Sequence, residues 1–185
     1  HIAPIVDEIS LEAALSLCRY GKLVSLDPQG FLRSFDRSGY VRPRRWLNKT
    51  FFKEVDVLKS SSKELFLTTQ TRALRKGLSK ARRLGPRICL ATMGARGVLL
   101  VSEDASFYKV PAYTPLQVVD PTGSGDAFAG AFLAEYLRTK DSVWSAALAS
   151  AAASYVVEGV GPSNFGTRDQ TEERAGKIME KVKNV

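Results

Sequence analysis

The sequence contains a single histidine, and this residue is His1 at the start of the chain. A Ser-His-Asp or Cys-His hydrolase needs an imidazole inside its site, and many metal sites use one as a ligand. The sequence therefore excludes those classes of site. It also contains only two cysteines, Cys18 and Cys89, which lie far apart in apolar surroundings. We expect two buried structural thiols there and no disulfide, thiol nucleophile or metal ligand.

No apolar run is long enough to span a bilayer, because the longest near-apolar stretch, Ala146–Val157, is short and rich in alanine. The chain also begins without a charged and then apolar leader. These features favour a cytoplasmic protein with no membrane partner. With 185 residues, 44% of them apolar and 25% charged, the composition is that of a folded chain, and we expect one domain over residues 1–185.

Acidic residues are scarce in the middle of the chain. Between Arg33 and Arg83 fifteen Lys and Arg face four Asp and Glu, whereas the whole chain carries +8. Such a region indicates a solvated helix face, steering of an anionic small ligand, or nucleic-acid binding. The helical spacing of the charges near residue 80 favours the first, and their scatter argues against a nucleic-acid partner.

Hydrophobic spacing predicts helices that alternate with strands. The expected helices are 10–20, 71–84, 127–138, 143–157 and 168–183, and the expected strands are 22–26, 54–58, 87–92, 97–101 and 106–110. The last two strands form a hairpin around a short acidic turn. Strands that alternate with helices imply βαβ units, so the expected class is α/β with a mainly parallel sheet covered by helices on both faces.

A glycine-rich segment carries the most chemical information. The segment DPTGSGD, Asp120–Asp126, follows an apolar run and precedes a strongly helical stretch. Glycines at the start of a helix let backbone N–H groups converge, and the positive end of the helix dipole favours an anion. No Lys-Ser/Thr follows as in a P-loop, and Phe128 stands where a dinucleotide motif has its third glycine. We predict a phosphate site of another kind at Gly123, Ser124 and Gly125.

Asp126 follows these glycines directly, so its carboxylate can face the same anion. There it could accept a proton from a substrate hydroxyl while the N–H groups stabilise a transferred phosphoryl group, which is a kinase arrangement. The alternative is an acid that only complements the helix dipole after a tight turn. Spacing alone leaves both interpretations open.

Residues 120–128, DPTGSGDAF, closely resemble the D-T-x-G-A-G-D motif of the ribokinase-like (PfkB) carbohydrate kinases. Pro121 and Ser124 are the departures. The resemblance implies that Asp126 is the catalytic base and that Gly123, Ser124 and Gly125 form the anion hole for the γ-phosphate of ATP. It also implies the ribokinase-like α/β fold.

A second segment, ATMGARGV at residues 91–98, resembles the family's T-x-G-x-x-G sequence, where a strand ends on the nucleotide. The resemblance implies cofactor contacts at Thr92, Gly94 and Gly97. Without it, this segment is a glycine turn between two strands.

A third segment, KSSSKE at residues 59–64, resembles the family's N-x-x-E motif, with Ser61 in place of Asn. The resemblance implies that Lys59 and Ser61 contact the cofactor and that Glu64 helps to organise Mg²⁺ near the phosphates. On the residues alone, Glu64 is a solvated acid at the start of a helix.

A fourth segment, EGVGPS at residues 158–163, resembles the stretch that in this family lies beside the adenine site and holds a monovalent cation. The resemblance implies a potassium-like ion near Asp120, Gly159 and Ser163. A simple helix stop is the alternative.

Within the family, DPQGFLRSFD at residues 27–36, taken with residues 58–62 and 116–122, looks most like the myo-inositol kinases. This implies ATP-dependent phosphorylation of a hydroxyl of a small polyol or sugar, with myo-inositol favoured. A ribose or nucleoside kinase and a non-catalytic nucleotide-binding fragment are the alternatives. On the residues alone, Asp27 and Arg33 close a strand and form a local ion pair.

The family also carries an N-terminal α/β portion with a β-rich lid, and no counterpart precedes His1. We therefore expect the C-terminal nucleotide-binding and catalytic part of such a kinase, with weak nucleotide binding and little turnover by itself, because closing lids exclude water and position the acceptor. A truncated sheet edge favours self-association as a homodimer.

Overall fold

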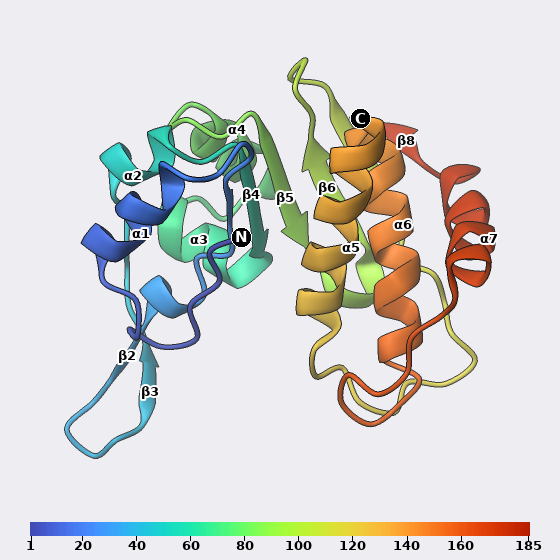
Figure 1. Ribbon diagram of the computed structural model, residues 1–185, viewed down its shortest axis with the longest axis horizontal. Helices are drawn as coiled ribbons and strands as arrows, with labels where there is room; N and C mark the ends of the chain where they lie inside the picture. Colours follow the sequence, from blue (N-terminus) through green and yellow to red (C-terminus); the bar gives the residue numbers. More distant parts are fainter. The chain divides into compact units, whose positions relative to one another are not determined.

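The computed structural model describes residues 1–185, and the chain divides into two compact units, His1–Ala91 and Thr92–Val185 (Figure 1). The single domain expected from the sequence stays a prediction. None of the helices has the length and apolar character needed to cross a membrane.

The first unit combines parallel strands with short helices. In chain order its elements are α1 (Leu11–Cys18), β1 (Ser25–Leu26), the 3₁₀ turn η1 (Gly30–Leu32), β2 (Arg33–Phe35), β3 (Val41–Pro43), α2 (Lys49–Lys53), β4 (Val57–Ser61), α3 (Ser62–Thr69), α4 (Leu74–Arg82) and β5 (Ile88–Thr92). Strand β4 lies between β1 and β5 and runs parallel to β1. Strands β2 and β3 form a separate antiparallel hairpin that extends away from the rest of the unit (Figure 1).

A local capping signal accounts for the start of α1. The Ser10 hydroxyl accepts a hydrogen bond from the Ala13 N–H at 3.1 Å, which caps α1 as the sequence predicts. The predicted strand 54–58 is wrong in its bounds, because Glu54 still belongs to the end of α2 and the extended chain begins at Val57. Helix α2 itself was not expected, and neither was the β2–β3 hairpin.

An aromatic cluster explains why the basic connection between β1 and β4 folds. The rings of Phe31 and Trp46 stack with their centres 4.5 Å apart, and Phe51 meets both rings edge-on. Phe51 and Phe52 are fully buried on α2. Burying such rings stabilises a short helix that its length alone would leave marginal.

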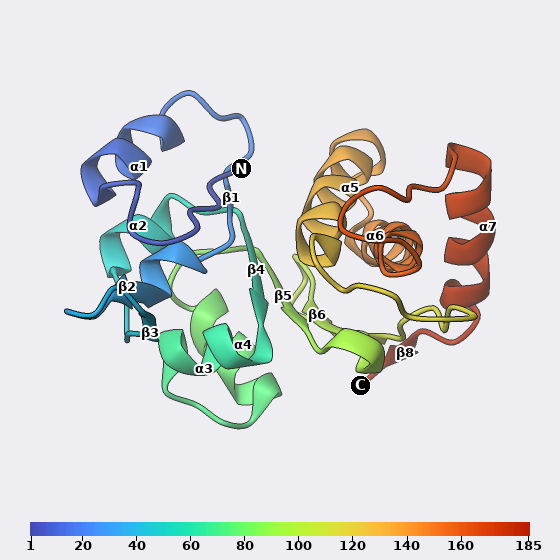
Figure 2. The ribbon, with the colours of Figure 1, turned by 90° about the horizontal axis from the view of Figure 1, so that it is seen from below.

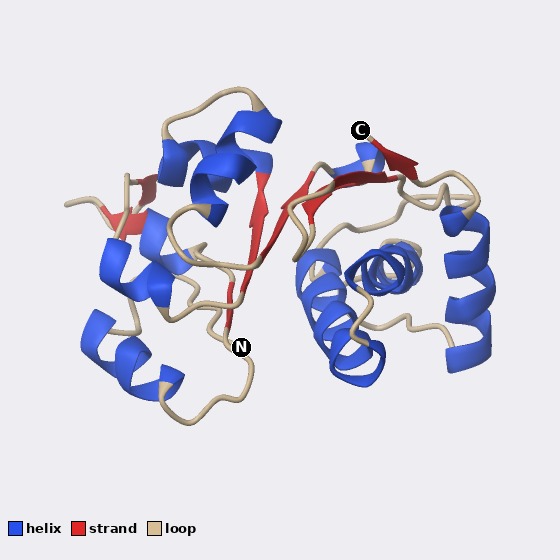
Figure 3. Cartoon of the chain, turned by 90° about the horizontal axis from the view of Figure 1, so that it is seen from above, coloured by secondary structure: helices blue, strands red, loops and turns tan.

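The second unit packs three helices on an antiparallel set of strands. Its elements are η2 (Gly94–Arg96), β6 (Val98–Val101), β7 (Phe107–Val110), α5 (Ser124–Thr139), α6 (Ser142–Val156), α7 (Arg168–Met179) and β8 (Lys183–Asn184). The expected hairpin is confirmed, since β6 pairs antiparallel with β7, and β7 pairs with the unexpected β8. Helix α6 lies between α5 and α7 (Figure 2), and the three helices lie on one side of the strands (Figure 3).

Both cysteines are buried and free, as the sequence predicts. Burial raises the pKa of the Cys89 thiol on β5 to about 12, so it stays protonated at neutral pH. Burial also raises the pKa of Cys18. Neither thiol is suited to act as a nucleophile.

A buried carboxylate joins the three helices of the second unit. The side chain of Glu135, on α5, has no exposed surface. Its oxygens accept hydrogen bonds from Arg138 at 2.6 Å and from the Trp144 indole at 2.7 Å, and Arg168 lies 2.9 Å away. The bond from Arg138 is the main reason why the pKa of Glu135 lies below its ordinary value, against the opposing effect of burial.

We expect Glu135→Gln to lower the free energy of unfolding by about 2 kcal/mol at neutral pH, because hydrogen bonds to a charged group are lost. A lowered folded-state pKa stabilises the protein at pH values above the unfolded pKa of about 4.3, and this contribution disappears as the pH falls through the folded pKa. Urea unfolding of both proteins between about pH 7 and 3 measures it. The two curves should converge in acid, and a constant gap would contradict the prediction.

Candidate functional site

The predicted phosphate segment, residues 120–126, forms a tight turn that leads into α5 and is called the glycine turn below. Gly123 is the N-cap of α5 with φ of +79°, in the left-handed region that glycine adopts most easily. A Cβ atom there would lie 3.3 Å from the ring of Pro162. The helix begins at Ser124, three residues earlier than the sequence predicts.

Some of the N–H groups at the start of α5 donate hydrogen bonds within the protein, and others have no acceptor. The Ser124 N–H donates to the Pro121 carbonyl at 3.2 Å, and the Asp126 N–H donates to the Gly123 carbonyl at 3.1 Å. The Ser124 hydroxyl also donates to the Pro121 carbonyl. The N–H groups of Gly123 and Gly125 have no hydrogen-bond partner. Of the three residues expected in the anion hole, these two are therefore the available donors.

Asp126 lies in the first turn of α5, directly after these donors. Its side chain is exposed, and no hydrogen bond or ion pair engages its carboxylate. A free carboxylate beside unpaired N–H groups is able to accept a proton from a bound hydroxyl. It also complements the helix dipole, so both interpretations from the sequence fit its position.

Asp120 fastens the glycine turn at its other end. One carboxylate oxygen accepts from the Thr122 N–H at 2.9 Å, and the other accepts from the Gly161 N–H at 2.9 Å. The hydrogen bonds from Thr122, followed by that from Gly161, hold the pKa of Asp120 below its usual value. Asp120 is therefore ionised at neutral pH and organises the turn.

Residues 157–164, called the facing loop, lie against the glycine turn at the end of the unit where α5 begins and α6 ends (Figure 1). The Val157 carbonyl accepts from the Val119 N–H at 2.7 Å. This loop contains Gly159 and Ser163, which the sequence links with Asp120 to a monovalent cation. Ser163 donates its hydroxyl to the Val160 carbonyl at 2.7 Å. The loop thus contacts Asp120 through Gly161, a contact that was not predicted from the sequence. The monovalent cation stays a prediction.

Thr92, Gly94 and Gly97 lie where β5 ends and β6 begins. Gly94 has φ of +58° and open space around its Cα, so a ligand could approach its backbone. Gly97 has φ of +85°, and a Cβ atom there would lie 2.1 Å from the Val110 carbonyl oxygen. Gly97 is therefore required by the packing of the hairpin, whatever it binds.

Lys59, expected to contact the cofactor, is engaged inside the first unit. Its ammonium lies 2.5 Å from an Asp27 carboxylate oxygen, and the side chains are only 10% and 7% exposed. Asp27 directly follows β1, at the carboxyl edge of the parallel strands where α/β proteins bind ligands, whereas Lys59 lies in the middle of β4.

Ser61 and Glu64 cap α3. The Ser61 N–H donates to a Glu64 carboxylate oxygen at 2.7 Å, and the Ser61 hydroxyl accepts from the Glu64 N–H at 3.3 Å. This capping box matches the helix-start interpretation of Glu64. The S-x-x-E spacing was a signal for α3 that could have been used.

The carboxylates and free N–H groups described above differ in whether they suit a metal ion or a phosphate. No three His, Cys, Asp or Glu side chains cluster as a metal cage. Mg²⁺ in phosphoryl-transfer sites usually binds one or two carboxylates together with substrate phosphates, and Glu64 fits that smaller requirement. The free N–H groups of Gly123 and Gly125 fit a phosphate.

Comparison with known proteins gives consistent matches. A cytidine kinase of Thermococcus kodakarensis is 34% identical over 140 residues, which cover 75% of this chain and 47% of that protein. A nucleoside kinase of Methanothermobacter thermautotrophicus is 32% identical over 141 residues, which cover 76% of this chain and 41% of that protein. The chain therefore spans less than half the length of these curated relatives.

The structure resembles a pyrophosphate-dependent myo-inositol-1 kinase that was converted into a myo-inositol-3 kinase, with a TM-score of 0.77, 27% identity, and 93% of this chain and 60% of that chain covered. The expected ribokinase-like α/β fold with a mainly parallel sheet is confirmed. Residues 35–169 match the family described as pfkB family carbohydrate kinase. Because this stretch covers most of the chain and includes the glycine turn and the segments at residues 59–64, 91–98 and 158–163, the chain belongs to the pfkB family of carbohydrate kinases.

Proposed function

We propose that the protein transfers a phosphoryl group from ATP to a hydroxyl of a small polyol or sugar, with myo-inositol as the preferred acceptor. One observation carries the proposal: the unpaired N–H groups of Gly123 and Gly125 lie beside the free carboxylate of Asp126 at the start of α5. The N–H groups are suited to a phosphoryl group and the carboxylate to a hydroxyl proton.

Each residue then has a separate task. Asp126 accepts the proton of the attacking hydroxyl, and the N–H groups of Gly123 and Gly125 stabilise charge on the transferred group. Mg²⁺ would supply positive charge that offsets the charge of the donor phosphates. The family resemblance is our reason for assigning Glu64 to that ion, and within the first unit its capping bond to Ser61 orients the carboxylate.

Exposed apolar side chains support a nucleotide donor. Val118 and Val119 precede the glycine turn and are 66% and 46% exposed, and Val160 in the facing loop is 74% exposed. Hydrogen bonds from Val119 and Gly161 hold these two segments together. Apolar surface beside an anion site suits a nucleobase. Pyrophosphate is the second candidate donor, because the similar myo-inositol kinase structure is described as pyrophosphate-dependent.

The acceptor has two candidates. The Asp27–Asp36 segment and the similar myo-inositol kinase structure favour a polyol. The curated relatives, described as cytidine and nucleoside kinases, favour a nucleoside. Both acceptors offer a hydroxyl that Asp126 could deprotonate, so the proposed chemistry is the same.

A donor titration followed by an acceptor panel tests the proposal. We expect calorimetry to detect weak MgATP binding, and a coupled assay to give a low turnover whose kcat/KM is highest with myo-inositol among myo-inositol, ribose, fructose and cytidine. Faster turnover of cytidine would mean that the preferred acceptor is a nucleoside. Stronger binding of pyrophosphate would mean that the donor is pyrophosphate and not ATP. Failure of both donors to bind would contradict the kinase function.

A further inference from the structure

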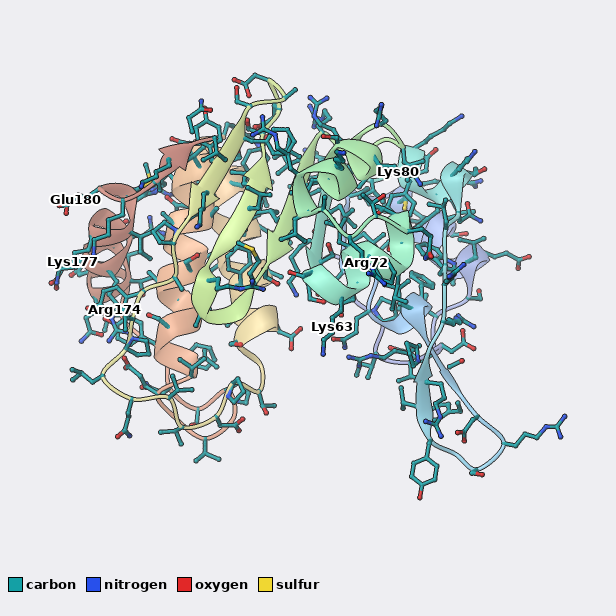
Figure 4. All side chains as sticks on the ribbon, turned by 180° about the vertical axis from the view of Figure 1, so that it is seen from behind. Lys63, Arg72, Lys80, Arg174, Lys177 and Glu180 are labelled. Atoms are coloured by element: carbon teal, nitrogen blue, oxygen red, sulfur yellow. The ribbon has the colours of Figure 1, made fainter.

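Arg174 lies on α7 (Figure 4), and its guanidinium lies over two aromatic rings. Its Cζ atom lies 3.5 Å from the centre of the Tyr155 ring and 4.5 Å from the centre of the Tyr113 ring. Its Nη1 group donates to the Ser154 hydroxyl at 2.8 Å, and its Nη2 atom lies 3.0 Å from a Glu158 carboxylate oxygen. The Arg174 side chain is only 16% exposed, so water screens these contacts weakly.

Two residues that Arg174 contacts hold the two ends of the facing loop in place. Glu158 is the second residue of this loop, directly after Val157, whose carbonyl accepts from the Val119 N–H. At the far end of the loop, the Asn164 side chain donates to the Tyr155 carbonyl at 2.8 Å. The loop is therefore fixed at its start through Glu158 and at its end through Tyr155.

The facing loop in turn holds the glycine turn. The Gly161 N–H donates to Asp120 at 2.9 Å, and Pro162 lies against Gly123. A continuous set of contacts thus leads from Arg174 to the residue that caps α5, without Arg174 touching the expected phosphate position. Contiguous packed and hydrogen-bonded groups of this kind are able to carry energetic coupling between distant residues.

We propose that Arg174 is a positioning residue for the glycine turn: by clamping Tyr155 and Glu158 it fixes the facing loop, and the loop sets the position of Asp120 and Gly123. The proposal rests on the proposed function, because it takes the glycine turn as the site of the donor phosphates.

The chemistry of arginine is required for this role. A planar guanidinium stacks on a ring with its face and donates hydrogen bonds with its edge, whereas a lysine ammonium is a point charge that does not do both. Arg174→Lys therefore keeps the charge and removes the geometry. Arg168→Lys is the matched control, because Arg168 lies on the same helix and its ion-pair partners, Glu135 and Glu172, are outside the facing loop.

The test combines donor affinity with amide hydrogen exchange in the whole protein. We expect Arg174→Lys to raise the Kd for MgATP, or for magnesium pyrophosphate, by about tenfold. We also expect faster exchange at the Val119 and Gly161 amides without any ligand. Arg168→Lys should leave both readouts at their wild-type values, even if it lowers the melting temperature.

Two results would overturn the proposal. Equal weakening of donor binding by both variants would mean that Arg174 acts only through the stability of α7. Unchanged exchange at Val119 and Gly161 in Arg174→Lys would mean that the clamp does not hold the loop. If the wild-type protein binds neither donor, the proposed function fails, and the exchange measurement still decides the role of Arg174.

Discussion

Asp126→Asn is expected to lower kcat by about 10²–10⁴-fold and to leave the Kd for MgATP close to its wild-type value. The amide has the size and hydrogen-bonding reach of the carboxylate but does not accept the hydroxyl proton. Because the donor is held by the N–H groups of Gly123 and Gly125, and removing a negative charge beside its phosphates does not weaken their binding, donor binding should be retained. A coupled assay and calorimetry measure the two quantities separately.

Asp169→Asn provides the matched control, because Asp169 is the acid in the first turn of α7. Both substitutions remove a charge that complements a helix dipole, a contribution of about 0.3–1 kcal/mol to stability. Only Asp126→Asn should abolish turnover. If it retains wild-type turnover, Asp126 is a helix-capping acid and not the base. If it loses donor binding together with turnover, the carboxylate belongs to the donor site.

Lys59→Met should lower the free energy of unfolding by about 3–5 kcal/mol, because it leaves the Asp27 carboxylate buried without its counter-ion and with only the Gln29 N–H as a donor. Urea unfolding measures this loss. Arg42→Met is the control, because the Arg42–Asp36 pair in the same unit is largely exposed at its arginine, and its removal should change stability far less.

The double variant Asp27→Asn/Lys59→Met distinguishes a buried-charge effect from a packing effect. Neutralising Asp27 removes the uncompensated charge, so the double variant should regain most of the stability that Lys59→Met loses. A double variant that is as unstable as Lys59→Met would assign the loss to the methylene packing of Lys59.

The elements with strong local signals were predictable from the sequence. Ser10 indicates the start of α1, and the glycines before α5 indicate a helix that begins with free N–H groups. The hairpin of β6 and β7 was predictable because two β-rich runs flank a short acidic turn.

Other elements depend on partners that are distant in the sequence. Helix α2 is short and exists because Phe51 and Phe52 are buried in an aromatic cluster. The basic residues around these two rings lower the local hydropathy, so the hydropathy pattern does not indicate a buried helix there. Strand β8 is two residues long and is defined only by its pairing with β7.

The candidate site divides in the same way. The motif at residues 120–126 predicts which residues form the glycine turn and that this turn leads into a helix. It does not reveal that Asp120 binds Gly161, or that Lys59 pairs with Asp27, because each bond joins segments that are far apart in the chain. The spacing within one segment carries no information about the partner segment.

The double attachment of Asp120 has a consequence for the thermodynamics of binding. Ordering a loop when a ligand arrives subtracts conformational entropy from the affinity. Here the bonds to Thr122 and Gly161 order the turn when the protein folds. The entropy of the turn is therefore lost during folding, and an incoming phosphate meets a preorganised set of dipoles that need little rearrangement.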